Sequence, residues 1–310
     1  MSSPRIVFLS GGTGTPKLLR GVVNVIDARN ITVIGNTGDD WHFYGLHVSP
    51  DIDSILLTLS DLIDTDKWWG IKDDTFNLVD FLKRHLKQDV WFNLGDFDAG
   101  LCLYRTHLLN LGKSLTESVE TIRRRLNVSS RVLPMADQPI QTKIRTPEQT
   151  LHLQEFWVKY KGEGPVSNVF FEGDLRKTTD QVLEAIQNAD VIIIGPSNPI
   201  SSVGPILALH PLRKALQKAS GYRIAISPII GKNAVSGPTS AFLKAWGHEV
   251  SPVAIVELFH DVLDAFMIHK TDQNYFDLIQ RMGITPILED IYIHTKADAS
   301  RLFERIMDSK

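Results

Sequence analysis

The chain has 310 residues, of which 43% are hydrophobic and 22% charged, so most of it is expected to fold around a full hydrophobic core. A formal net charge of -3, from 33 basic and 36 acidic residues, gives no basic surplus for binding nucleic acid or an anionic membrane, and no run approaches the roughly 18 apolar residues of a transmembrane helix. The single cysteine, Cys102, excludes an intrachain disulfide and suits a reducing compartment, so together with an N-terminus that lacks a signal-peptide layout it predicts a cytoplasmic protein.

The first residues follow the pattern of a βαβ unit. Residues 6–9 form a short apolar run typical of a buried parallel strand, and residues 31–34 form a second one. Between them, a glycine-rich stretch over residues 10–17 leads into a helix whose apolar positions repeat at helical spacing. Two parallel strands need such a crossover helix, so this order predicts a βαβ unit.

A long loop follows the second predicted strand and extends from Gly35 to Pro50. Loops of this length inside compact domains are uncommon and often functional. The loop ends at a predicted helix, for which Ser49 is a candidate N-cap and Pro50 a candidate first residue. The buried stripe of this helix runs on to Ile63.

The next stretch predicts further helices and a strand. A helix over about residues 76–86 precedes a third predicted strand at 90–94, which Gly95-Asp96 closes. A further helix starts after Ser114, which has capping-box spacing to Glu117.

The pattern then changes over residues 132–173 to short strand-like pieces rich in aromatic residues, which predicts an inserted lobe. The earlier pattern resumes over residues 174–310, with a final helix near residues 300–307 and strands at 191–194, 223–226 and 286–288. Residues 1–131 and 174–310 are therefore predicted to form one α/β core. We expect a Rossmann-like, mostly parallel, doubly wound sheet with a smaller inserted lobe.

The loop Ser10-Gly-Gly-Thr-Gly-Thr-Pro-Lys17 has the composition of an anion-binding loop. Ligands of open parallel sheets bind beyond the carboxyl ends of the strands, where such a loop offers main-chain N–H groups and a helix N-terminus. It lacks the third glycine of a dinucleotide fingerprint, and Lys17 lacks the flanking residues of a Walker A loop. A tight structural turn is the alternative. The residues expected to contact the ligand are Gly11, Gly12, Thr13, Gly14 and Lys17.

Four aspartates cluster in the sequence beside this loop: Asp39 and Asp40 after the second strand, and Asp51 and Asp53 in the first turn of the next helix. Phosphate-linked substrates commonly bring Mg²⁺, which takes one or two carboxylates plus substrate oxygens. We therefore predict metal or substrate binding here. Plain stabilisation of a helix N-terminus is the alternative for Asp51 and Asp53.

Two further loops are predicted to reach the same edge of the sheet. Gly95-Asp96 closes the third predicted strand, and Arg105 follows on the next helix, where it is expected to bind a phosphate. A helix cap with a surface ion pair is the alternative for Asp96 and Arg105. The residues Ser197, Asn198 and Pro199 follow a buried strand and are expected either to bind substrate or to cap the next helix. The histidines show no zinc-site spacing.

From the first strand to about Gly237, the sequence resembles the 2-phospho-L-lactate transferase family of coenzyme F-420 biosynthesis. The order and spacing of many short segments carry the resemblance. These are Ser10-Gly-Gly-Thr-Gly14, Gly35-Asn-Thr-Gly-Asp-Asp40, Pro50-Asp-Ile-Asp53, Trp69-Gly70, Trp91-Phe-Asn-Leu-Gly-Asp96 with Asp98, Arg105-Thr106, Glu155-Phe-Trp157, Pro196-Ser-Asn-Pro199, Gly204-Pro205-Ile206 and Ser227-Pro-Ile-Ile230.

The resemblance implies transfer of the phospholactyl group of lactyl-2-diphospho-5′-guanosine to the ribityl hydroxyl of 7,8-didemethyl-8-hydroxy-5-deazariboflavin, with release of GMP. It also implies Mg²⁺ dependence and a homodimer. When this implied reaction is combined with the candidate residues, each residue can be assigned a role. Asp51 and Asp53 are the first choice for the metal and the acceptor's ribityl end, Asp96 would assist the attacking hydroxyl, and Arg105 would stabilise the transferring phosphate.

The remaining substrate-binding residues are also expected from the matched segments. Asp39 and Asp40 are expected to orient the metal or substrate, and Asn36 and Thr37 to line the site beside them. Candidates to pack on the deazaflavin ring are Trp91, Trp41, Phe43 and Trp69, for each of which core packing is the alternative.

Two other functions stay open at this point. A related branch of the fold resembles regulators that bind nucleotide-sugars without catalysis. A nicotinamide dehydrogenase is suggested by the glycine loop alone, and the missing third glycine argues against it. Within the transferase hypothesis, the sequence leaves the donor open between phospholactate, phosphoenolpyruvate and phosphoglycerate.

Overall fold

The computed structural model describes residues 3–235 and 237–310. Its centre is a seven-stranded sheet in the order β14-β13-β10-β9-β1-β2-β5, and every neighbouring pair in it is parallel. The predicted α/β, doubly wound class is therefore confirmed. The strands are β1 (Ile6–Ser10), β2 (Ile31–Gly35), β5 (Arg131–Pro134), β9 (Val191–Ile194), β10 (Tyr222–Ile226), β13 (Ala265–His269) and β14 (Thr285–Glu289).

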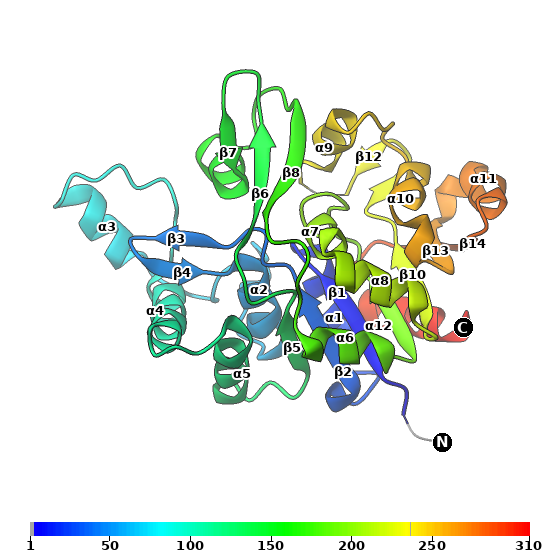
Figure 1. Cartoon of the computed structure of the whole chain (residues 1–310), viewed down its shortest axis with the longest axis horizontal. Helices are drawn as coiled ribbons and strands as arrows, with labels where there is room; N and C mark the ends of the chain where they lie inside the picture. The colour runs from blue at the N-terminus through cyan, green and yellow to red at the C-terminus, as the bar shows by residue number, and fades with distance from the viewer. Residues whose placement is uncertain (1–2, 236) are drawn as a thin grey trace.

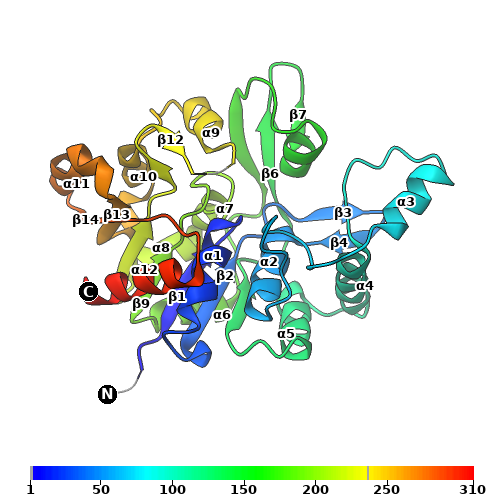
Figure 2. The ribbon, with the colours of Figure 1, turned by 180° about the vertical axis from the view of Figure 1, so that it is seen from behind.

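Helices cover both faces of the sheet, as Figures 1 and 2 show from opposite sides. The face seen in Figure 2 carries α1 (Gly14–Val22), α2 (Pro50–Leu59), α5 (Leu115–Arg125) and α12 (Lys296–Asp308). The face seen in Figure 1 carries α6 (Asp180–Gln187), α7 (Gly204–Ala208), α8 (His210–Lys218) and α10 (Pro252–Phe259). The predicted capping box begins α5, where Ser114 and Glu117 bond each other's main-chain N–H groups.

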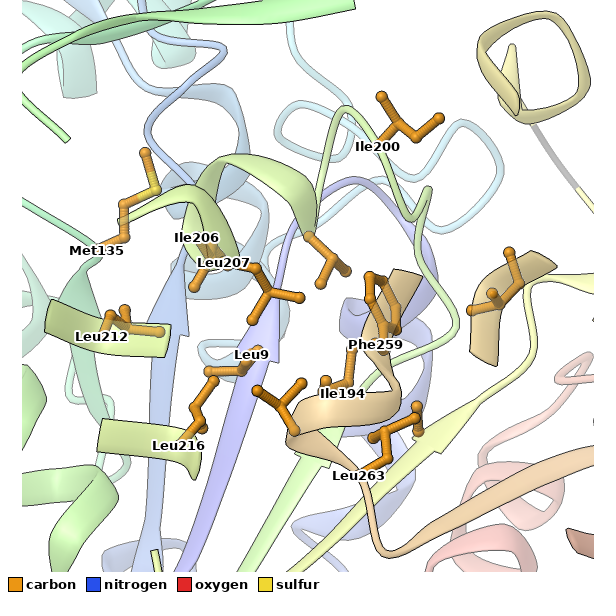
Figure 3. Packing of buried hydrophobic residues seen from close by; sticks show 14 of the residues in the cluster. Leu9, Met135, Ile194, Ile200, Ile206, Leu207, Leu212, Leu216, Phe259 and Leu263 are labelled. Carbon is orange, nitrogen blue, oxygen red and sulfur yellow. The ribbon is translucent and has the colours of Figure 1, made fainter. Parts of the chain in front are cut away.

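Strand alternation explains how one sheet fills two cores. Ile6 and Phe8 of β1 belong to the core beneath α1 and α12, whereas Val7 and Leu9 belong to the core on the other face. Figure 3 shows part of the second core, in which Leu9 lies beside residues of α7 and α8. Because both faces are buried, the strands read as continuous apolar runs.

The order of the strands creates a switch point in the middle of the sheet. From β1 the chain moves outward to β2 and β5, and it then returns to β9 on the other side of β1 and moves outward to β14. The chain therefore leaves β1 and β9 toward opposite faces of the sheet, since α1 follows β1 on one face and α7 follows β9 on the other. Such a position is where open parallel sheets bind ligands.

The part of the chain that connects β2 to β5 forms an arm that projects from the sheet (Figure 1). It contains the hairpin β3 (Trp41–Phe43) and β4 (Leu46–Val48), followed after α2 by α3 (Asn77–Arg84) and α4 (Asp96–Asn110). The predicted strand at residues 90–94 is wrong: this segment is irregular, and its apolar side chains pack between the hairpin and the two helices. Cys102 is buried in the same cluster, and burial raises the pKa of its thiol to about 12.

The inserted lobe is an antiparallel sheet in the order β7-β6-β8. It contains β6 (Ile140–Arg145), β7 (Thr150–His152), a π-helical turn (Glu155–Lys159) and β8 (Asn168–Gly173). The predicted lobe boundary at residue 132 is too early, because β5 pairs with β2 and belongs to the core sheet.

The last third of the chain adds smaller elements around the core. These are the hairpin β11 (Ile229–Ile230) and β12 (Asn233–Ala234), α9 (Thr239–Ala245), α11 (Phe276–Arg281) and short 3-10 turns at residues 28–30, 260–262 and 270–275. No helix within the described ranges is long and apolar enough to cross a membrane.

Candidate active site

The loops after β1 and β9 interlock at the switch point. Gly12 has a φ of +58°, a conformation that suits glycine, and α1 begins at Gly14. A Cβ on Gly14 would lie 2.0 Å from the carbonyl oxygen of Pro196, so no larger residue fits there. The Thr15 hydroxyl lies 2.9 Å from the Ser197 hydroxyl, and the Thr15 N–H donates to the same oxygen at 3.3 Å. Two of the predicted loops thus form one wall.

Asp51 reaches this wall from the first turn of α2. Its carboxylate accepts the Gly12 N–H and the Asn36 side-chain amide, each at 2.8 Å. Asn36 in turn donates to the Ser201 carbonyl at 3.3 Å and accepts the Gly38 N–H at 2.7 Å. Burial raises the pKa of Asp51 to about 6, even though these hydrogen bonds favour the carboxylate.

Asp39 and Asp40 lie beside Asp51, as predicted. Burial raises the pKa of Asp39, and the charge of Asp51 raises it further. Burial also raises the pKa of Asp40, which accepts the Ser49 hydroxyl at 2.6 Å and lies 3.4 Å from the His47 Nε2. Ser49 is the N-cap residue of α2 and Pro50 its first residue, as predicted, but the Ser49 hydroxyl bonds Asp40 and makes no cap hydrogen bond within the described residues. These buried carboxylates repel one another and favour a cation.

Asp53 faces a different partner. Its carboxylate forms an ion pair with the Arg105 guanidinium, which is 0% exposed and also donates to the His47 carbonyl at 3.1 Å. Residues two apart on a helix do not face each other, so Asp51 and Asp53 are directed differently. The structure thus brings Asp51 together with Asp39, and it brings Asp53 together with Arg105.

Asp96 does not lie at the ligand edge of the sheet, contrary to the sequence prediction, because the preceding segment is not a strand of that sheet. Its carboxylate accepts the N–H groups of Asn77 at 3.0 Å and Leu78 at 2.9 Å, and the Thr75 hydroxyl at 2.5 Å. These bonds lower its pKa to about 2. Asp96 is therefore a helix cap, the alternative that the sequence left open, and it caps the start of α3.

Aromatic side chains line a cavity beside the acidic residues. The Trp41 and Trp91 rings lie 5.3 Å apart and bound a cavity of about 220 Å³. Its lining is Trp41, His42, Phe43, Tyr44, Asp89, Val90, Trp91 and Phe92. Trp69 is not part of this lining and lies on the surface beside Lys67. Lys17 lies 5.3 Å from the Trp68 ring, and burial lowers its pKa.

Three buried polar atoms near the switch point have no hydrogen-bond partner among the residues that the structure describes. They are Ser10 Oγ at the end of β1, Thr37 Oγ1 after β2 and Asn198 Nδ2 after β9. The other side-chain atom of Asn198 caps the turn by accepting the Ile200 and Ser201 N–H groups. Buried polar groups in proteins are normally paired, so these atoms indicate a place for a polar ligand.

One site residue was named from the sequence without a role, and another was not named. Asp98 belongs to a segment matched in the resemblance, and burial together with the charges of Asp53 and Asp74 raises its pKa to about 7. Ser202 packs against the glycine loop, where its Oγ would lie 3.0 Å from a Cβ on Gly12. No motif marked it.

The acidic residues suit a cation held partly by substrate. Among the described residues, no group of three or more His, Cys, Asp or Glu side chains is arranged to hold a metal ion. Mg²⁺ commonly uses only one or two protein carboxylates and completes its shell with water and phosphate oxygens. Asp39 and Asp51 are two interacting buried carboxylates without a cationic partner among the described residues, whereas Arg105 already neutralises Asp53.

The family model described as 2-phospho-L-lactate transferase CofD matches residues 6–301. The chain belongs to this family. Among its curated relatives, the 2-phospho-L-lactate transferase of Methanocaldococcus jannaschii is 38% identical over 308 residues, which cover 98% of this chain and 97% of the relative. That of Methanosarcina barkeri is 36% identical, with 97% of both chains covered.

Membership makes the chain an enzyme, a transferase of the 2-phospho-L-lactate transferase family. A solved structure from Bacillus halodurans, described as a member of the UPF0052 family, matches with a TM-score of 0.67 at 19% identity and covers 99% of this chain and 100% of its own. At that identity the likeness concerns the fold alone.

Proposed function

We propose that this transferase moves the 2-phospholactyl group from lactyl-2-diphospho-5′-guanosine to the ribityl hydroxyl of 7,8-didemethyl-8-hydroxy-5-deazariboflavin, and releases GMP. The observation that carries the proposal is the set of unpartnered polar atoms and the buried acidic pair around the glycine loop, next to an aromatic cavity. Together they suit a phosphate-rich donor and a flat acceptor.

The donor's diphosphate would lie over the glycine loop. The loop offers main-chain N–H groups at the start of α1, and Thr37 and Asn198 offer polar atoms beside it that bond no other described residue. The Gly12 N–H is already used by Asp51, so the loop is held in shape before a ligand arrives. Lys17 contributes positive charge one turn into the helix.

The acceptor's ring would lie in the aromatic cavity between Trp41 and Trp91. A flat aromatic ligand gains from stacking on such side chains and from burial of its apolar faces. Trp41 directly follows Asp40, so a ring in this cavity would direct its ribityl chain toward the buried carboxylates. This arrangement would bring both substrates to one edge of the sheet.

We propose Mg²⁺ as the metal, held by Asp51 with Asp39 and by donor oxygens. When bound, Mg²⁺ would withdraw charge from the diphosphate and favour departure of GMP. The predicted pair Asp51 and Asp53 is less suitable, since Asp53 is already paired with Arg105. The buried Arg105 then acts on the site by holding Asp53 and the His47 carbonyl in place.

The transfer itself exchanges one P–O bond for another. The ribityl oxygen bonds to the phosphorus next to lactate, the bond from that phosphorus to the bridging oxygen breaks, and GMP leaves with that oxygen. The proton of the hydroxyl passes to a nearby carboxylate or to water. Catalysis of such transfers rests mainly on positioning and charge stabilisation, which this chain's buried polar groups would supply.

The test is direct product analysis. Purified protein is mixed with the guanosine donor, the deazaflavin and Mg²⁺, and GMP and the phosphorylated deazaflavin are separated by chromatography. We expect both products in equal amounts, and no product with any divalent metal would refute the proposal. Parallel reactions with the phosphoenolpyruvate and phosphoglycerate analogues of the donor identify the preferred acyl group.

Two remaining expectations follow from the family resemblance and the composition. A homodimer is proposed, and sedimentation velocity of the purified protein tests it. A cytoplasmic location is proposed from the lone cysteine, which is buried and unpaired, and cell fractionation tests it.

A further inference from the structure

The inserted lobe contacts residues 38–41, the segment that contains Asp39 and Asp40, through three side chains. These are Thr142, His152 and Gln154, which we call the lobe clamp. The Gln154 side-chain amide donates to the Asp39 carbonyl at 3.4 Å. The His152 ring lies 4.9 Å from the Trp41 ring. All three clamp residues are buried although they belong to a lobe outside the central sheet. The lobe therefore contributes to the site through its contacts with the segment that contains Asp39.

Thr142 makes the closest of these contacts. Its N–H donates to the Gly38 carbonyl at 2.7 Å, and its hydroxyl donates to Asp39 Oδ1 at 3.3 Å. The side chain is 0% exposed. A Cβ on Gly38 would lie 2.8 Å from the Thr142 hydroxyl and 2.9 Å from Pro205, so the loop is packed tightly between the lobe and α7.

The contact matters because Asp39 and Asp51 are both buried and repel each other. Two such carboxylates separate unless other groups hold them. Asn36 and Gly12 hold Asp51 from the core. Asp39 is bonded from two sides, by the Asn36 side chain of the core and by the Thr142 hydroxyl of the lobe. Removal of the Thr142 hydroxyl would leave the Asp39 carboxylate without its bond to the lobe.

We propose that Thr142 is a positioning residue for the transfer: from the lobe, it holds the Asp39 carboxylate against Asp51. The proposal rests on the proposed function for its catalytic consequence. Thr142 touches no reacting atom and acts only through Asp39.

The matched variants are Thr142→Val, Thr142→Ser and Thr150→Val. Valine keeps the shape and removes the hydroxyl, serine restores the hydroxyl, and Thr150 is an exposed position of the same lobe. We expect Thr142→Val to lower kcat about tenfold with little change in either KM, since a lost hydrogen bond to a charged group has roughly this effect. Thr142→Ser and Thr150→Val should stay near the wild type.

A double-mutant cycle with Asp39→Asn separates positioning from general loosening of the fold. If Thr142 acts through Asp39, then adding Thr142→Val to Asp39→Asn causes no further loss of kcat. An equal tenfold loss in both backgrounds would overturn the proposal, as would a Thr142→Val enzyme with wild-type kcat.

A readout without substrates keeps the proposal distinct from the proposed function. Binding of Mn²⁺ alone is followed by the electron paramagnetic resonance signal of the free ion. We expect Thr142→Val to weaken Mn²⁺ binding several-fold and Thr142→Ser to restore it, whether or not the wild type makes the expected product. Equal binding by wild type and Thr142→Val, or no binding by either, contradicts the positioning role.

Discussion

Asp74 and Asp96 each cap the helix that begins beside the other residue. The Asp74 carboxylate accepts the N–H groups of Phe97 at 2.9 Å and Asp98 at 3.1 Å, at the start of α4. The Asp96 carboxylate accepts those of Asn77 and Leu78, at the start of α3. Each acid satisfies main-chain donors at a helix N-terminus, where negative charge is favourable. The exchange ties the start of α3 to the start of α4, and α4 carries Arg105.

Replacement of Asp96 by alanine should therefore destabilise the protein more than it affects chemistry. We expect the Tm of Asp96→Ala to fall by a few degrees, because α3 loses its cap, while kcat stays within about threefold of the wild type. Thermal unfolding and steady-state kinetics on the same preparation check this. A large loss of kcat at unchanged Tm would show instead that Asp96 takes part in the transfer.

Arg105 should be needed for stability because it is a fully buried cation. Arg105→Met leaves the Asp53 carboxylate buried without a partner, which costs about 3–5 kcal/mol in comparable cases. Urea unfolding measures the free energy of unfolding, and the double variant Asp53→Leu with Arg105→Met is the control. We expect the double variant to be more stable than Arg105→Met. Identical stability of the two variants would mean that the pair is not coupled.

The aromatic cavity predicts a change confined to the acceptor. Trp91→Leu should raise the KM for the deazaflavin about tenfold through lost stacking and leave the KM for the donor unchanged. Trp69→Leu is the control, since Trp69 lies outside the cavity. Steady-state kinetics with each substrate varied in turn provides the measurement. If both variants behave alike, the ring binds elsewhere.

His152 predicts how stability depends on pH. Burial lowers its pKa from 6.5 to about 4, so the unfolded chain binds a proton between these values that the folded chain does not. The wild type should therefore lose stability relative to His152→Gln as pH falls from 6.5 toward 4, by up to about 3 kcal/mol. Urea unfolding of both proteins at several pH values checks the sign. If the difference in stability between wild type and His152→Gln does not change with pH, the His152 ring is not buried in its neutral form.

The sequence predicted the centre of the fold because buried parallel strands read as continuous apolar runs, as residues 6–9, 31–34 and 191–194 do. The same signal failed at residues 90–94. A short apolar run is buried equally well against helices, and here it packs between the hairpin and α4. β5 was placed in the lobe because its pairing with β2 is a long-range contact that no local pattern carries.

The candidate site was predictable in position and not in its internal pairing. The loops containing Gly12, Asn36 and Ser197 do meet at one edge of the sheet, as strand order requires. The sequence could not show that Asp51 turns toward Asp39 while Asp53 turns toward Arg105. That choice depends on α4, which reaches α2 only through the folding of the projecting arm.

The central claim is that the transfer takes place at the carboxyl ends of β1, β2 and β9, and Asp51→Asn tests it most directly. The measurement is kcat for formation of phosphorylated deazaflavin by wild type, Asp51→Asn and Asp96→Ala, each confirmed as folded by thermal unfolding. We predict that Asp51→Asn loses at least about 100-fold in kcat, because the amide removes the negative charge that would hold Mg²⁺ at the reacting centre. Asp96→Ala should remain active. A folded Asp51→Asn enzyme that turns over like the wild type would contradict the account.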